Sequence, residues 1–211
     1  MKTKKFFVNA LTFSRLPFIF AWMAMAVAVE LGPVDFWFGF WTLMMMGASG
    51  ISDFFDGMLA RRWDVVSTLG KMADPLMDKV FFVVTFPTML WVIAHQGDSA
   101  HAVMMLAFTV LYMVRDLWVT FLRSVGTMYG ADVGAMWLGK VRTALSFLCA
   151  GWVYMYLIWG ALANDAWRSA WLTSCYLFEA LMMALTVLSV VTYTNAYAPC
   201  LKKALERKCE M

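Results

Sequence analysis

The stretch between Asp53 and Asp78 sets the character of the whole chain. It reads DFFDGMLAR over residues 53–61 and, after eight more residues, GKMADPLMD over residues 70–78. Its four aspartates, spaced by three, eighteen and four residues, are Asp53, Asp56, Asp74 and Asp78. The flanking sequence is strongly apolar, where a lone carboxylate tends to take up a proton. Since neighbouring carboxylates also repel one another, the pattern predicts one or two bound divalent cations beside a membrane.

The composition predicts a membrane protein. Of the 211 residues, 63% are hydrophobic and 15% are charged, whereas a soluble domain is about 45–50% apolar. A spanning helix needs about 20 mainly apolar residues, and six runs qualify: 6–29, 35–60, 71–94, 101–125, 137–162 and 170–196. We therefore predict an all-α, polytopic integral membrane protein with six transmembrane helices. Residues 1–200 would form one transmembrane domain, and 201–211 a short basic tail.

Basic residues gather on one side of the predicted membrane. That side holds Lys2, Lys4, Lys5, Arg61, Arg62, Arg123, Lys140, Arg142, Lys202, Lys203, Arg207 and Lys208. The other side holds four acids, Glu30, Asp35, Asp98 and Asp165, with Arg168 as its only basic residue. By the positive-inside rule, both termini are predicted to be cytoplasmic. Residues 53–78 would then lie at the cytoplasmic edge of the inner membrane, within reach of both lipid and water-soluble substrates.

Polar residues on the first two predicted helices extend this candidate site. Asn9, Thr12 and Arg15 recur every three residues and form a polar stripe. The stripe is either part of a site or a helix-end anchor with Arg15 reaching the headgroups. On the second helix, residues 53, 56, 57 and 60 share one face that has no bulky side chain between its carboxylates, which suits a bound ligand. Arg61 follows and can bind phosphate.

Four basic residues later in the chain predict an anion pocket. Arg115 and Arg123 are eight residues apart, so they project to roughly the same side of a helix. Lys140 and Arg142 open the next predicted helix near the same side of the membrane. A structural salt bridge between Arg115 and Asp116 is the alternative. We favour the pocket because intramembrane charges usually mark function.

Several other ionisable residues have simpler interpretations. Lys79 is a candidate partner for Asp78. Glu179 is expected to pair with a neighbour and is left out of the site. His95 and His101 are interpreted as solvated loop residues rather than ligands. The thiols of Cys149 and Cys175, in apolar runs, are expected to be packed.

The motif carries a resemblance to a known family. The pattern Asp-x2-Asp-Gly-x2-Ala-Arg-x8-Gly-x3-Asp-x3-Asp is complete from Asp53 to Asp78. It resembles the signature of the CDP-alcohol phosphotransferases, membrane enzymes with six transmembrane helices. The segments NALTFSR (9–15), DPLMDK (74–79), RD (115–116) with LR (122–123), and GKVRT (139–143) are similar to the phosphatidylglycerophosphate synthase branch of that family. That branch usually has Arg-Glu at positions 115–116, and often lysine at position 142.

The resemblance implies a reaction and a set of roles. CDP-diacylglycerol and sn-glycerol 3-phosphate would react to give phosphatidylglycerophosphate and CMP. The cofactor would be Mg²⁺ or Mn²⁺, with two ions bound. Asp53, Asp56 and Asp74 would bind metal, and Asp78 would be the general base and a further ligand. The CDP part would be bound by Asp53, Asp56, Gly57, Ala60, Arg61, Gly70, Asn9 and Thr12. The acceptor's phosphate would be bound by Arg115, Arg123, Lys140 and Arg142. A homodimer is expected, and no nucleic acid partner.

Alternative functions remain open from the sequence. Other acceptors within the family are inositol phosphate, serine, choline or a phospholipid. An intramembrane prenyltransferase also binds a diphosphate through aspartates and magnesium, but needs no Gly57–Arg61 nucleotide face. An ion transporter would distribute its acids through the membrane depth and break its helices. An EF-hand is excluded, since Phe54 and Phe55 occupy ligand positions.

Overall fold

The computed structural model describes residues 2–31, 36–63, 68–129 and 137–206. Within its helices, the side chains of residues 2–6, 8, 9, 29, 31, 51, 53–57, 60, 61, 68–72, 74, 75 and 206 lie outside the description. The elements are α1 (Lys2–Leu31), α2 (Phe36–Arg62), α3 (Thr68–His95), α4 (Ser99–Met128), α5 (Trp137–Trp159), η1 (Gly160–Leu162) and α6 (Asp165–Glu206). The described part contains no strand. Six long helices at the six predicted places confirm the all-α prediction.

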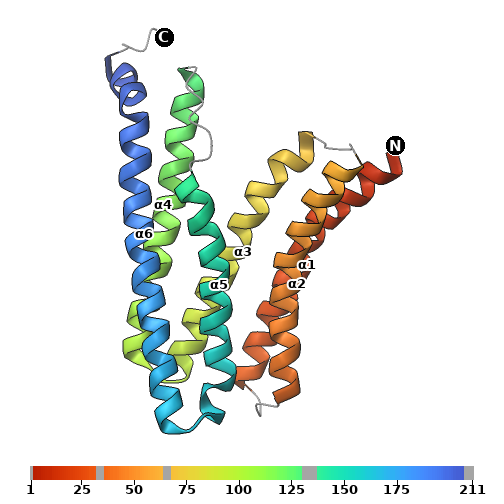
Figure 1. Cartoon of the computed structure of the whole chain (residues 1–211), viewed down its shortest axis with the longest axis vertical. Coiled ribbons are helices and arrows are strands. Elements are labelled where there is room, and N and C mark those ends of the chain that lie inside the picture. Colours follow the sequence, from red (N-terminus) through yellow and green to blue (C-terminus); the bar gives the residue numbers. More distant parts are fainter. Residues whose placement is uncertain (1, 32–35, 64–67, 130–136, 207–211) are drawn as a thin grey trace.

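The helices form one bundle (Figure 1). α1 packs against both α2 and α3, and α4 packs along α6. The two groups are joined by contacts of α3 with α4 and of α5 with α2 and α6. The start of α1 and the end of α6 lie at the same end of the bundle (Figure 1). The predicted cytoplasmic location of that end stays a prediction.

Helix length and hydropathy identify a multi-pass membrane protein. Among the described residues, five helices are long and apolar enough to cross a membrane, with candidate spans in α1, α3, α4, α5 and α6. α2 is not among them. Its apolar run ends at the acidic motif that begins with Asp53.

The last helix extends further than the predicted span. α6 has 42 residues and continues through 201–206, instead of ending near residue 196. The reason is local propensity, since Leu, Lys, Ala and Glu all favour helix once a helix is under way. Residues 207–211 lie outside the described residues.

Aromatic packing joins α3, α4 and α5 at the wall of the candidate site. Phe82 of α3 contacts Tyr112 of α4 and Phe147 of α5, with ring centroids 5.0 and 4.7 Å apart. Phe86 adds a further contact with Tyr112 at 5.0 Å. Such pairs contribute about 0.5–1.5 kcal/mol each beyond the area they bury. These contacts hold α3, α4 and α5 together beside the polar residues of the candidate site.

The prediction for His101 is wrong. His101 is fully buried, and its Nε2 lies 2.9 Å from Oε1 of Glu179 on α6. The cause is the start of α4: Asp98 caps the helix by accepting a hydrogen bond from the His101 amide, so His101 lies in the first turn, against α6. The pairing of Glu179 with another residue is confirmed. His95 is exposed, as predicted, and stacks on Trp91 with centroids 5.1 Å apart.

The two cysteines in apolar runs behave as predicted. Cys149 of α5 and Cys175 of α6 are both buried free thiols. They belong to the main apolar core.

Candidate active site

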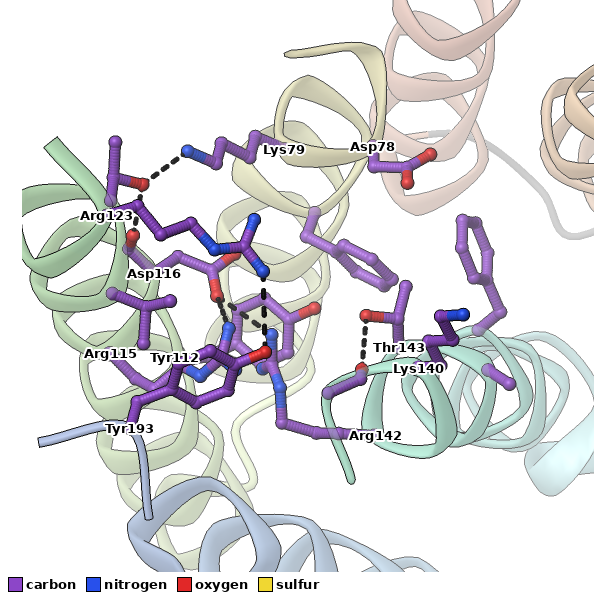
Figure 2. Close-up of a pocket in the computed structure, with 16 residues that line it drawn as sticks. Asp78, Lys79, Tyr112, Arg115, Asp116, Arg123, Lys140, Arg142, Thr143 and Tyr193 are labelled. Carbon is purple, nitrogen blue, oxygen red and sulfur yellow. Dashed lines mark hydrogen bonds and ion pairs between the residues drawn. The ribbon is translucent and has the colours of Figure 1, made fainter. Parts of the chain in front are cut away.

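A cavity of about 700 Å³ lies between α3, α4, α5 and α6. Its charged lining residues are Asp78 and Lys79 from α3, Arg115, Asp116 and Arg123 from α4, and Lys140 and Arg142 from α5 (Figure 2). The structure thus brings together Asp78 and all four residues predicted to bind an acceptor phosphate. Five cationic side chains face two carboxylates, so the cavity is strongly positive.

Asp116 bridges two arginines from different helices. Its Oδ1 accepts hydrogen bonds from Arg115 Nη1 and from Arg142 Nη2, each at 2.8 Å. The predicted alternatives, a salt bridge and a pocket, therefore occur together. The shared carboxylate holds two like charges close to each other, although it neutralises only one of them.

Arg142 is the most deeply buried cation of the cavity. It is 2% exposed, and its guanidinium carbon lies 4.2 Å from the ring centroid of Tyr112. Among the described residues, its Nε and Nη1 atoms have no hydrogen-bond partner. Leaving buried donors of a charged group unpaired is costly. A guanidinium in this state at a cavity wall is therefore suited to an anionic ligand.

Arg115 is fixed by α6. Its Nε and Nη2 both donate to Ser189 Oγ, at 3.0 and 2.6 Å, while Nη1 is bound to Asp116. Tyr193 of α6 also lines the cavity. Neither Ser189 nor Tyr193 was singled out from the sequence. A serine and a tyrosine in an apolar helix carry no signal of their own. Only their spacing of four residues, which puts them on one helical face, could have pointed to a shared role.

Asp78 has a different partner from the one predicted. Lys79 Nζ donates to Thr120 Oγ1 of α4 at 2.6 Å, because neighbouring residues on a helix point in different directions. Asp78 Oδ1 instead lies 3.5 Å from Nη1 of Arg15 on α1. Arg15 is 4% exposed, so it does not reach for headgroups. The headgroup-anchor interpretation of Arg15 is therefore wrong, and membership of the stripe in the site stays a prediction.

The remaining predicted site residues are only partly described. Thr12 is buried on α1, one turn before Arg15. The residues whose side chains lie outside the description are Asn9 on α1, Asp53, Asp56, Gly57, Ala60 and Arg61 on α2, and Gly70 and Asp74 on α3. Both halves of the motif are helical, as the predicted shared faces require.

The metal site also stays a prediction. No group of three histidine, cysteine or acidic side chains placed to hold a metal ion occurs among the side chains that are described. Three of the four predicted ligands, Asp53, Asp56 and Asp74, are outside that set. The donor set itself fits magnesium or manganese, since both prefer carboxylate oxygen.

Several known proteins have sequences that are similar to parts of this chain. The chain is 41% identical over 51 residues to the cardiolipin synthase (CMP-forming) of Streptomyces coelicolor, a match covering 24% of each chain. It is 32% identical over 109 residues to the CDP-diacylglycerol–glycerol-3-phosphate 3-phosphatidyltransferase of Mycoplasma genitalium, covering 52% of this chain and 42% of the relative. With the enzyme of the same name from Escherichia coli K12, identity is 27% over 119 residues, covering 56% and 62%. Each match thus spans less than two thirds of the relative.

A match to a family model covers far more of the chain than these pairwise matches. The model, described as CDP-alcohol phosphatidyltransferase, matches residues 6–191. It therefore includes the acidic motif on α2 and α3 and every charged residue that lines the cavity. The chain belongs to the CDP-alcohol phosphatidyltransferase family.

Proposed function

We propose that this protein transfers the phosphatidyl group of CDP-diacylglycerol to sn-glycerol 3-phosphate, giving phosphatidylglycerophosphate and CMP. The observation that carries this proposal is the cavity in which Asp78 and four cations, Arg115, Arg123, Lys140 and Arg142, line one space. A base and an anion site in the same cavity suit an acceptor that has both a hydroxyl and a phosphate. The enzyme would act in the inner membrane, as a homodimer, with its active site at the cytoplasmic face.

The excess of positive charge supports a phosphorylated acceptor. A phosphate monoester carries up to two negative charges and suits guanidinium groups, which bind its oxygens in pairs. The unpartnered donors of Arg142 would find acceptors there. Choline, a cation, would be repelled by this cavity, and serine would leave most of its charge uncompensated. The branch of the family that uses glycerol 3-phosphate is also represented among the relatives.

The proposed chemistry uses Asp78 as the base. Its carboxylate would take the proton of the acceptor's hydroxyl as that oxygen attacks the phosphorus attached to diacylglycerol. A new P–O bond forms, the P–O bond to the bridging pyrophosphate oxygen breaks, and CMP leaves with the electron pair. Arg15, 3.5 Å from Asp78, would help to orient the carboxylate toward the acceptor.

The motif between Asp53 and Asp78 would bind the donor, CDP-diacylglycerol. Asp53, Asp56, Asp74 and Asp78 would hold Mg²⁺ or Mn²⁺, which when bound supplies charge neutralisation for the pyrophosphate. Gly57 and Ala60 would leave room for the CDP part against α2. Arg61, Gly70, Asn9 and Thr12 complete the residues proposed to bind it.

A second acceptor has a specific observation in its favour. The relative with 41% identity over 51 residues is a cardiolipin synthase (CMP-forming), a name that points to a lipid acceptor. Phosphatidylglycerol has a phosphodiester that cations also bind. We rank it second because that match covers only 24% of this chain and because a phosphodiester carries a single charge.

The test is CMP release by the purified protein from CDP-diacylglycerol in mixed micelles with magnesium or manganese. Parallel reactions would contain sn-glycerol 3-phosphate, inositol phosphate, serine, choline or phosphatidylglycerol, with the Asp78→Asn variant as a blank. Release that depends on sn-glycerol 3-phosphate is the expected result. Release that depends on phosphatidylglycerol, or on any other acceptor of the panel, would overturn the proposed acceptor while leaving the family chemistry in place.

A further inference from the structure

Arg123 differs from the other arginines of the cavity in being exposed. It lies near the end of α4, and its side chain is accessible to solvent. A long cationic side chain at a membrane edge normally extends to water or headgroups. Figure 2 shows the Arg123 side chain turned across the cavity instead, toward Tyr193. Some interaction must offset the rotamer freedom that this orientation costs.

That interaction is with Tyr193 of α6. Arg123 Nη2 donates to the Tyr193 hydroxyl at 3.4 Å, and its guanidinium carbon lies 5.6 Å from the ring centroid. Among the described residues, Arg123 has no other hydrogen-bond or ion-pair partner. Tyr193 thus meets Arg123 both through its hydroxyl and through the face of its ring.

Tyr193 is itself rigidly held. It is 1% exposed and packs in a small apolar cluster with Val119 and Leu122 of α4. Arg115 also lies against its ring, with the guanidinium carbon 5.2 Å from the centroid. On the α5 side, a Cβ atom at Gly139 would lie 3.0 Å from the tyrosine hydroxyl. A larger residue at position 139 would therefore push this hydroxyl aside by a few tenths of an ångström.

We infer that Tyr193 is a positioning residue for the acceptor, which keeps the exposed guanidinium of Arg123 turned into the cavity beside the buried one of Arg115. This inference rests on the proposed function, in which the cavity binds the phosphate of the acceptor. An aromatic ring within reach of two guanidinium groups attracts both. Tyr193 acts through the arginines, so it sets the affinity for the acceptor and leaves CDP-diacylglycerol binding unchanged.

The first test compares Michaelis constants. Tyr193→Phe keeps the ring and loses the hydroxyl, and we expect the acceptor KM to rise about 3- to 10-fold. Tyr193→Leu also loses two cation–π contacts, and we expect a rise of about 10-fold or more. The KM for CDP-diacylglycerol should change less than about twofold. The matched control is Tyr197→Leu, which removes an equally buried ring one turn further along α6 that does not line the cavity.

The second test asks whether Tyr193 acts through Arg123. In an Arg123→Ala background, Tyr193→Phe should have little further effect on the acceptor KM, because the group it positions is gone. Independent, multiplying effects of the two substitutions would overturn the inference. So would equal changes in the KM of both substrates for Tyr193→Leu, since these indicate a general loss of structure.

The proposed acceptor and the proposed role of Tyr193 can be overturned independently of each other. If the panel shows a different acceptor, the same comparisons are made with that acceptor, and an unchanged KM in the Tyr193 variants overturns the inference alone. If no acceptor supports release, stabilisation of the wild-type protein against thermal unfolding by inorganic phosphate becomes the measurement. Stabilisation that is weakened in Tyr193→Leu but retained in Tyr197→Leu supports the inference. Its absence in the wild type overturns it.

Discussion

His101 Nε2 and Glu179 Oε1 lie 2.9 Å apart between α4 and α6, with both side chains fully buried. Their other polar atoms, His101 Nδ1 and Glu179 Oε2, have no protein partner among the described residues. The pair lies near the start of α4, whereas Arg115, Asp116 and Arg123 line the cavity further along this helix. It therefore joins the two helices at a distance from the proposed chemistry.

Breaking this pair should lower stability without changing the reaction. His101→Leu leaves the Glu179 carboxyl without its partner, and we expect unfolding to become easier by about 1–3 kcal/mol. The double variant His101→Leu/Glu179→Leu removes both polar groups and should recover most of that loss. Thermal unfolding in detergent measures both. A single variant as stable as the wild type would show that the pair contributes nothing.

Asp78→Asn should abolish turnover while CDP-diacylglycerol still binds, because the amide cannot take the acceptor's proton. We expect the rate to fall at least about 100-fold, within the range typical of a lost general base. Asp98→Asn is the matched control, since Asp98 caps α4 away from the cavity and asparagine caps equally well. Near-normal turnover of Asp78→Asn would remove Asp78 from the base role.

Chelation of divalent cations should stop CMP release if the four aspartates of the motif bind metal. Adding magnesium or manganese to the chelated enzyme should restore activity, because hard cations with carboxylate ligands exchange with solution. Asp56→Asn should raise the metal concentration needed for half-maximal release. Activity that persists in excess chelator would contradict the metal requirement.

Arg142→Gln should weaken acceptor binding more than any other single change in the cavity. The substitution removes a buried charge and its two unpartnered donors, and we expect kcat/KM for the acceptor to fall about 100-fold. Arg142→Lys should recover only part of it, because lysine cannot bind two oxygens in a plane. The control is Arg168→Gln, an exposed arginine at the start of α6. Equal losses in both variants would argue against a specific anion site.

Asp116→Asn should disturb both arginines that it bridges. The amide oxygen still accepts hydrogen bonds but carries no charge, so the repulsion between Arg115 and Arg142 is no longer offset. We expect a roughly 10-fold higher KM for the acceptor and a lower unfolding temperature. Asp116→Glu should retain the charge and show the smaller loss. If the asparagine variant binds the acceptor more tightly, the carboxylate competes with the ligand instead of ordering its site.

The sequence was sufficient for the number of helices and for five charged residues that line the cavity, Asp78, Arg115, Arg123, Lys140 and Arg142. Apolar runs report the membrane directly, and helical spacing correctly put Arg115 and Arg123 on one side of α4. Contacts between helices were harder to predict from the sequence. The burial of His101 depended on α4 starting at Ser99, two residues before the predicted start. The roles of Ser189 and Tyr193 depended on the pairing of α4 with α6, which no local pattern encodes.

The exposed apolar side chains of α6 also suggest an expected depth for the cavity in the bilayer. Large apolar residues face outward from Trp167 to Val191, a length of about 36 Å at 1.5 Å per residue. The hydrocarbon core of a bilayer is about 30 Å thick. Tyr193 follows immediately after this band, although the apolar candidate span of α6 continues to Leu205. If the band from Trp167 to Val191 fills the hydrocarbon, we expect the cavity to open near the lipid headgroups, where a small phosphorylated solute would enter from water and acyl chains would remain among lipids.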